Sequence, residues 1–81
     1  MQQPSGTALV VGASSGIGKA IAEQLLASGW RVGVTSRKLE NLQDLVAKNG
    51  DRAVPKAIDI DDPEGARLGL KALAEHLGGV D

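Results

Sequence analysis

The feature that most constrains this fold is an apolar run followed by three glycines and the start of a helix. The run Thr7–Val11 is mostly apolar, which predicts a parallel strand covered on both faces. Gly12 permits a sharp turn off that strand, Gly16 leaves space for a ligand beside the main chain, and Gly18 lets the next helix pack closely against the strand. The unpaired N–H groups of the first helical turn, around Ile17, then face an anion. The stretch therefore predicts a strand–turn–helix unit that holds the phosphates of a dinucleotide.

Two alternatives fit these glycines less well. An ordinary strand-to-helix turn also contains glycine, but here apolar residues follow at helical spacing and are expected to face the sheet: Ile17, Ile21, Leu25 and Leu26. A P-loop would end in a sequence like Gly18-Lys19. However, Ala13 stands where its first glycine belongs, and Ala20 replaces the Ser or Thr that would hold magnesium.

The rest of the chain continues the alternation of strands and helices. Strands are predicted at 30–35 and 53–58, and helices at 16–28, around 39–50 and from Asp62 to Gly78-Gly79. This order predicts an α/β fold: a Rossmann-like three-layer α/β/α arrangement on a short parallel sheet of three strands in the order 3-2-1, with the fourth strand missing. Pro55 lacks an N–H and places the third strand at the sheet edge. We expect residues 1–6 to be a flexible N-terminus and residues 7–81 to be a partial NAD(P)-binding domain.

Three single residues have modest expected roles. Trp30, the only aromatic residue, is interpreted as a packing residue at a helix–strand corner rather than as a stacking surface for substrate. Asp62 is predicted to cap the third helix, with Pro63 at its first position. His76 falls in the last turn of that helix, where the helix dipole favours a solvated histidine, and no motif surrounds it with catalytic partners.

The composition excludes several classes of protein. Nine basic and ten acidic residues give a net charge of −1, which argues against a nucleic-acid-binding surface. No apolar run approaches the ~20 residues that span a bilayer, and there is no secretory leader pattern, so a soluble cytoplasmic protein without membrane contact is expected. The absence of cysteine excludes disulfides and thiolate metal sites.

The spacing Gly12-x-x-x-Gly16-x-Gly18 resembles the cofactor loop of the short-chain dehydrogenase/reductase family. The resemblance implies hydride transfer between a nicotinamide cofactor and a carbonyl or alcohol substrate. It also implies that Asp59 receives the adenine amino group, with Ile60 against the adenine ring. Val11 stands where the family commonly has threonine, which predicts the loss of a small polar contact beneath the loop.

The residues after the second predicted strand indicate which dinucleotide is preferred. An acid about 20 residues past the glycine loop would bind the ribose hydroxyls, but this chain has Ser36-Arg37-Lys38 there. Arg37 can clamp a 2′-phosphate, Ser14 can donate to it, and Lys38 is either a second cation or a solvated residue. The sequence thus predicts NADP(H) over NAD(H). The full set of candidate cofactor-binding residues is Gly12, Ser14, Ser15, Gly16, Ile17, Gly18, Ser36, Arg37, Lys38, Asp59 and Ile60.

No catalytic residue and no metal ligand is predicted. The acidic cluster around Asp59 lacks the ligand series and turn glycine of a calcium loop. The family's Asn-Asn-Ala-Gly segment, catalytic serine and Tyr-x-x-x-Lys pair have no counterpart here, and the chain contains no tyrosine. Three hypotheses follow: the front part of a reductase, inactive by itself; a stand-alone nucleotide-binding module; or a scaffold whose open first strand pairs with another copy or with a complementing fragment.

Overall fold

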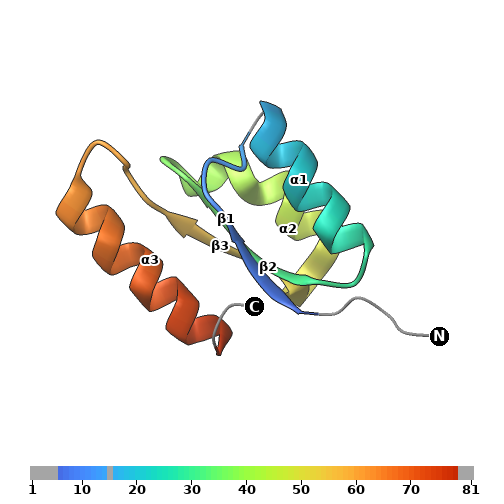
Figure 1. The fold of residues 1–81 in the computed structure, drawn as a ribbon. Coiled ribbons are helices and arrows are strands. Elements are labelled where there is room, and N and C mark those ends of the chain that lie inside the picture. Colours follow the sequence, from blue (N-terminus) through green and yellow to red (C-terminus); the bar gives the residue numbers. More distant parts are fainter. Residues whose placement is uncertain (1–5, 15, 79–81) are drawn as a thin grey trace.

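The computed structural model describes residues 6–14 and 16–78, which form one three-stranded sheet with helices on both faces (Figure 1). Most of the predicted N-terminal end, Ser15 and the predicted helix end at Gly79 lie outside these residues. The elements in chain order are β1 (Thr7–Val10), α1 (Gly16–Ala27), β2 (Arg31–Ser36), the 3₁₀ turn η1 (Leu39–Leu42), α2 (Gln43–Asn49), the 3₁₀ turn η2 (Gly50–Arg52), β3 (Ala53–Ala57) and α3 (Pro63–Leu77).

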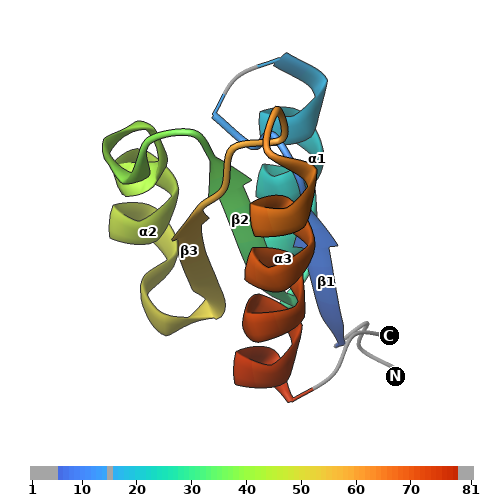
Figure 2. The same ribbon diagram turned by 90° about the vertical axis from the view of Figure 1, so that its left-hand side faces the viewer.

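The sheet is parallel, with β2 between β1 and β3. Leu9 pairs with Gly33, and Val34 pairs with Pro55. Helices α1 and α2 cover one face and α3 covers the other (Figures 1 and 2). The predicted α/β class, the three layers and the strand order are therefore confirmed. Within the described residues β3 pairs only with β2, which agrees with the edge position predicted from Pro55.

The main core lies between the sheet and the α1–α2 layer. Val32 and Val34 of β2 are fully buried there because alternate strand residues point to the same face. Trp30 is half-buried and packs against this core, which confirms the packing role predicted for it. The other buried members of the cluster are Val10, Ala13, Ala22, Leu26, Leu42, Leu45 and Ala53.

Helix α3 approaches the opposite face of the sheet at Gly33. A Cβ added to Gly33 would lie 2.6 Å from Leu9 Cδ2 and 2.9 Å from Leu77 Cδ1. Leu73 and Leu77 are the buried residues of α3, so this strand glycine makes room for the helix's apolar side. The N-terminus of α3 is capped as predicted, because Asp62 Oδ1 accepts a hydrogen bond from the Gly65 N–H at 3.2 Å.

The face predicted for α1 is right for Leu25 and Leu26, which pack in the core, and wrong for the two isoleucines. Ile17 and Ile21 do not face the sheet: they are 80% and 46% exposed, while the buried residues of α1 are Ala22 and Leu26. Gly18 closely approaches the main chain after β1, so the side of α1 that carries Gly18 and, four residues later, Ala22 faces the sheet. The side that carries Ile17 and Ile21 is therefore directed away from the sheet.

Smaller differences concern the bounds of elements. The second predicted helix is divided into η1 and α2. Strand β2 is shifted by one residue and includes Ser36, while β3 starts at Ala53 as predicted and ends one residue earlier, before Ile58. Hydrogen bonding with a three-residue separation, from the Asn41 N–H to the Lys38 carbonyl, tightens the first turn. Across residues 6–14 and 16–78, no helix has both the length and the apolar character needed to cross a membrane.

Candidate functional site

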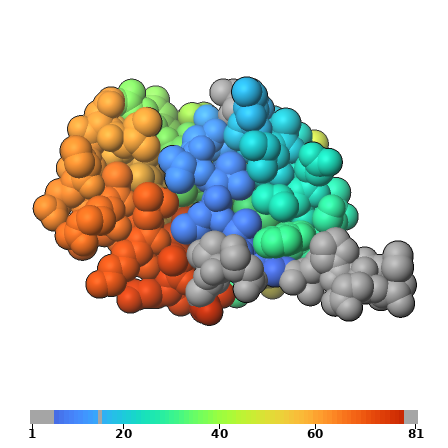
Figure 3. Space-filling model, in the orientation of Figure 1, coloured from blue at the N-terminus to red at the C-terminus, as the bar shows by residue number. Residues whose placement is uncertain are grey.

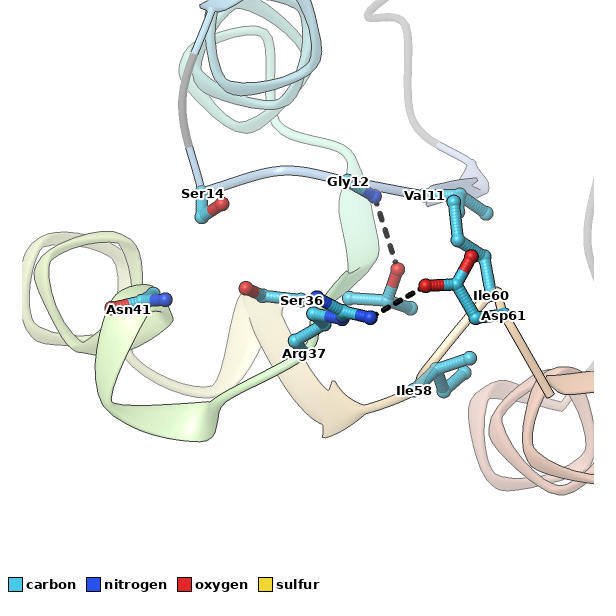
Figure 4. A pocket seen from close by; sticks show the side chains of 10 residues that line it. Val11, Gly12, Ser14, Ser36, Arg37, Asn41, Ile58, Ile60 and Asp61 are labelled. Atoms are coloured by element: carbon cyan, nitrogen blue, oxygen red, sulfur yellow. Dashed lines mark hydrogen bonds and ion pairs between the residues drawn. The ribbon is translucent and has the colours of Figure 1, made fainter. Parts of the chain in front are cut away.

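A cavity of about 470 Å³ opens at the carboxyl ends of the three strands (Figure 4). Ligands of open parallel α/β sheets bind at this end, and the volume lies within the ~300–1,000 Å³ of small-molecule pockets. Its walls come from the turn after β1, the end of β2, η1 and the loop after β3. The lining residues are Val11, Gly12, Ser14, Thr35, Ser36, Arg37, Asn41, Ile58, Ile60 and Asp61.

The turn after β1 is fixed by β2. The Gly12 N–H donates to Thr35 Oγ1 at 3.1 Å, and the Ala13 N–H donates to the Thr35 carbonyl at 2.8 Å. Thr35 itself is buried. Val11 stands where the resemblance led us to expect a threonine, and Thr35 of the neighbouring strand supplies a polar contact to the loop backbone instead.

The three glycines of the loop differ in what they make possible. Gly12 and Gly16 have φ angles of 77° and 63°, in the region that L side chains rarely adopt. A Cβ on Gly16 would have no neighbouring atom within 4 Å, so the backbone there is open to a ligand. A Cβ on Gly18 would lie 2.2 Å from the Gly12 carbonyl oxygen, so only glycine permits this contact between α1 and the turn.

Arg37 follows β2 and reaches across the cavity mouth toward the loop after β3. Its Nη2 donates to Asp61 Oδ2 at 2.6 Å (Figure 4). The same Nη2 lies 3.4 Å from Asp59 Oδ1. Ser36 is the last residue of β2, and its carbonyl accepts the Ile58 N–H at 2.9 Å, which holds the ends of β2 and β3 together. Arg37 is the cation and Asp61 the anion among the residues that line the cavity.

The cavity brings together only some of the residues predicted from the sequence. Gly12, Ser14, Ser36, Arg37 and Ile60 line it. Five others do not: Gly16, Ile17 and Gly18 lie at the start of α1, Lys38 is exposed before η1, and Asp59 contacts Arg37 outside the lining set. Ser15 lies outside the described residues.

Sequence reasoning did not single out Thr35, Asn41, Ile58 or Asp61 as part of the site. Thr35 and Ile58 stand at or just after the ends of neighbouring parallel strands, a position that could have indicated them because such ends converge. Asn41 enters the cavity from the 3₁₀ turn, and no motif predicts that geometry. Among the described residues, no group of three or more acidic, histidine or cysteine side chains is arranged to hold a metal ion.

Comparison with known proteins agrees with this fold and loop. A family model described as short chain dehydrogenase matches residues 6–81. Serine 3-dehydrogenase from Rhizobium radiobacter is 38% identical over 77 residues, which are 95% of this chain and 31% of that protein. The chain thus spans a little under a third of the length of this curated relative.

Solved structures give the same result. A short-chain dehydrogenase from Streptomyces avermitilis superposes with a TM-score of 0.89 at 40% identity, over 99% of this chain and 29% of its own. The 3-ketoacyl-(acyl-carrier-protein) reductase from Brucella melitensis, solved in complex with NADH, has a TM-score of 0.81 at 28% identity, over 93% and 31% of the two chains. The chain therefore belongs to the short-chain dehydrogenase family and corresponds to one part of its longer members.

Proposed function

We propose that this chain is the NADP(H)-binding part of an oxidoreductase that transfers a hydride between the nicotinamide and a carbonyl or alcohol substrate. The observation that carries the proposal is a single cavity that joins the glycine turn after β1 to Arg37 after β2. The turn leads into α1, whose first N–H groups can bind a phosphate, and Arg37 offers a cation to a further phosphate.

Several features support a dinucleotide in this cavity. Gly16 leaves the loop backbone open on the side where a pyrophosphate would approach the start of α1. Ile58 and Ile60 supply apolar wall for an adenine ring, and Asp59 beside them can accept its amino group. The Brucella relative is complexed with NADH, which supports a nicotinamide dinucleotide for the family.

The preference for NADP(H) rests on the end of β2. A carboxylate at this position would accept hydrogen bonds from both ribose hydroxyls and repel a 2′-phosphate, whereas here the residue is Arg37. The hydroxyls of Ser14 and Ser36 line the same cavity and can donate to the phosphate. Lys38, which is exposed and outside the cavity lining, would add only a diffuse positive charge.

The hydride transfer itself needs groups that residues 1–81 do not contain, so we expect these residues alone to bind the cofactor without turnover.

One observation favours a complementary partner for β1. Within the described residues β1 pairs only with β2, and Figure 3 shows this segment at the surface between α1 and α3. The aliphatic side chains of Val11, Ile17 and Ile21 are exposed nearby in the sequence. We infer that this edge accepts a strand, either from a complementing fragment or from a second copy. A cytoplasmic location stays a prediction.

A titration of the purified chain with NADPH and with NADH tests the proposal. At each concentration the Tm is measured by thermal unfolding and the oligomeric state by sedimentation. A ligand that binds only the folded state adds about 2.7 kcal/mol of stability at a hundred-fold excess over its Kd. For a domain of this size, that corresponds to a rise in Tm on the order of 10–20 °C. We expect this rise with NADPH and a much smaller one with NADH at the same concentration.

Two other outcomes would count against the proposal. Equal rises with both dinucleotides would remove the preference for NADP(H) while leaving dinucleotide binding in place. No rise with either, in a chain that unfolds cooperatively as an oligomer, would overturn the binding function and favour a scaffold that associates through the β1 edge.

A further inference from the structure

The cation proposed to read the 2′-phosphate is already paired with carboxylates of the same chain. Arg37 Nη2 lies 2.6 Å from Asp61 Oδ2 and 3.4 Å from Asp59 Oδ1. The shorter contact is a charge-assisted hydrogen bond, the kind that Arg37 would also make with a phosphate oxygen. Arg37 and Asp61 both line the cavity, so this pair lies where the cofactor would bind (Figure 4).

Asp61 is held in place to make this contact. Its own N–H donates to Asp59 Oδ1 at 2.9 Å, and the Asp62 N–H donates to the Asp59 carbonyl at 3.1 Å. These two bonds fold the loop after β3 into a compact turn, and the Asp61 carboxylate projects from it toward the end of β2. The Asp61–Arg37 contact is therefore positioned by a defined turn on the aspartate side, although the arginine side chain is long.

We propose that Asp61 is a specificity-determining residue that competes with the 2′-phosphate for Arg37. This inference rests on the proposed preference for NADP(H). A 2′-phosphate can take the Nη2 donor of Arg37 only if Asp61 releases it. Its dianion must also approach the Asp61 carboxylate. Both effects weaken binding of the phosphorylated form. A dinucleotide without that phosphate needs neither change. Asp61 therefore reduces the difference in affinity between NADP(H) and NAD(H).

The exposure of the pair indicates that it contributes little to folding. The side chains of Arg37 and Asp61 are 64% and 75% exposed, and ion pairs in this environment add little to the stability of a protein. An Asp61→Asn variant keeps the shape of the side chain and the backbone turn, and it removes the charge. We therefore expect this variant to fold like the wild type, with an unchanged Tm.

The test compares 2′,5′-ADP, which carries the 2′-phosphate, with 5′-AMP, which lacks it, by titration calorimetry. D61N should bind 2′,5′-ADP about two- to five-fold more tightly than the wild type. This is the change in Kd expected from the small free energy of an exposed ion pair. Its affinity for 5′-AMP should stay the same. Glu64→Gln is the matched control, because it removes one carboxylate charge from the neighbouring turn of the chain, where Glu64 pairs with Arg67 at 3.1 Å instead. This control should leave both affinities unchanged.

A double-mutant cycle separates competition for Arg37 from a general charge effect. In an Arg37→Ala background, D61N should give a clearly smaller gain for 2′,5′-ADP than in the wild-type background, since the guanidinium for which Asp61 competes is gone and only the repulsion between the two anions is relieved. An equal gain in both backgrounds would overturn the inference, as would weaker binding of 2′,5′-ADP by D61N, which would mean that Asp61 orients Arg37.

The failure of this inference and the failure of the proposed function give different results. If R37A loses affinity for 2′,5′-ADP but D61N leaves it unchanged, the competition is refuted and the preference for NADP(H) stands. If the wild type binds 2′,5′-ADP no better than 5′-AMP and R37A changes nothing, the preference itself fails, and the role of Asp61 fails with it.

Discussion

Replacing Gly18 with alanine should lower the free energy of unfolding by about 2 kcal/mol and the Tm by about 10 °C. The added Cβ would lie 2.2 Å from the Gly12 carbonyl oxygen and 3.0 Å from the Gly12 carbonyl carbon, so the backbone of the turn or α1 must move. Alanine favours a helix over glycine by about 1 kcal/mol, which offsets part of this cost. A chain of this size rarely has more than about 3–5 kcal/mol from its core, so the change removes a large fraction of its stability.

Gly69→Ala is the matched control for this variant. Gly69 also lies within a helix, but a Cβ there would meet only side-chain atoms, the nearest being Ile58 Cγ1 at 3.1 Å. These atoms can shift, so we expect a change in Tm of at most a few degrees in thermal unfolding followed by circular dichroism. A G18A chain as stable as G69A would contradict the close contact between α1 and the turn.

Arg37→Ala should weaken NADPH binding by about 10- to 100-fold. This range corresponds to the loss of one hydrogen bond to a charged group, which contributes about 1.5–3 kcal/mol. NADH affinity should change by less than about two-fold, because NADH has no 2′-phosphate for the guanidinium to bind. The fold should be unaffected, since the ion pairs that Arg37 makes with Asp59 and Asp61 are exposed. Titration calorimetry with both dinucleotides measures the two affinities directly.

Lys38→Ala separates a specific contact from the general effect of positive charge. The two cations are adjacent in the chain, but Arg37 lines the cavity and Lys38 does not. We expect K38A to weaken NADPH binding by less than about three-fold, as a charge screened by salt would. Equal losses for NADPH and NADH in R37A, or equal losses in R37A and K38A, would refute the 2′-phosphate contact.

The elements of this fold were largely predictable because their signals are local. The strand–turn–helix unit at Gly12, Gly16 and Gly18 needs particular backbone conformations that other residues adopt poorly. Asp62 and Pro63 mark the start of α3 by their own hydrogen bonding and backbone angle. Strand order followed from chain order, since each crossover connects neighbouring parallel strands.

The side-chain environment was less predictable because it depends on contacts between distant segments. The spacing of Ile17 and Ile21 fits an amphipathic helix, but the tight approach of Gly18 to Gly12 determines which row of α1 is buried. Arg37 and Asp61 are 24 residues apart, and their contact exists because β2 and β3 end side by side. The support of the loop by Thr35 likewise depends on the pairing of β1 with β2.

The central claim is that a dinucleotide binds at the carboxyl ends of these three strands. Amide chemical-shift mapping of the isotopically labelled chain with NADPH tests it residue by residue. We predict the largest perturbations at Gly12, Ser14, Ser36, Arg37 and Ile60, with little change at Lys56, Leu73 and His76, which line a separate cavity near β3 and α3. Perturbations concentrated at that second cavity, or none at saturating NADPH, would contradict the account.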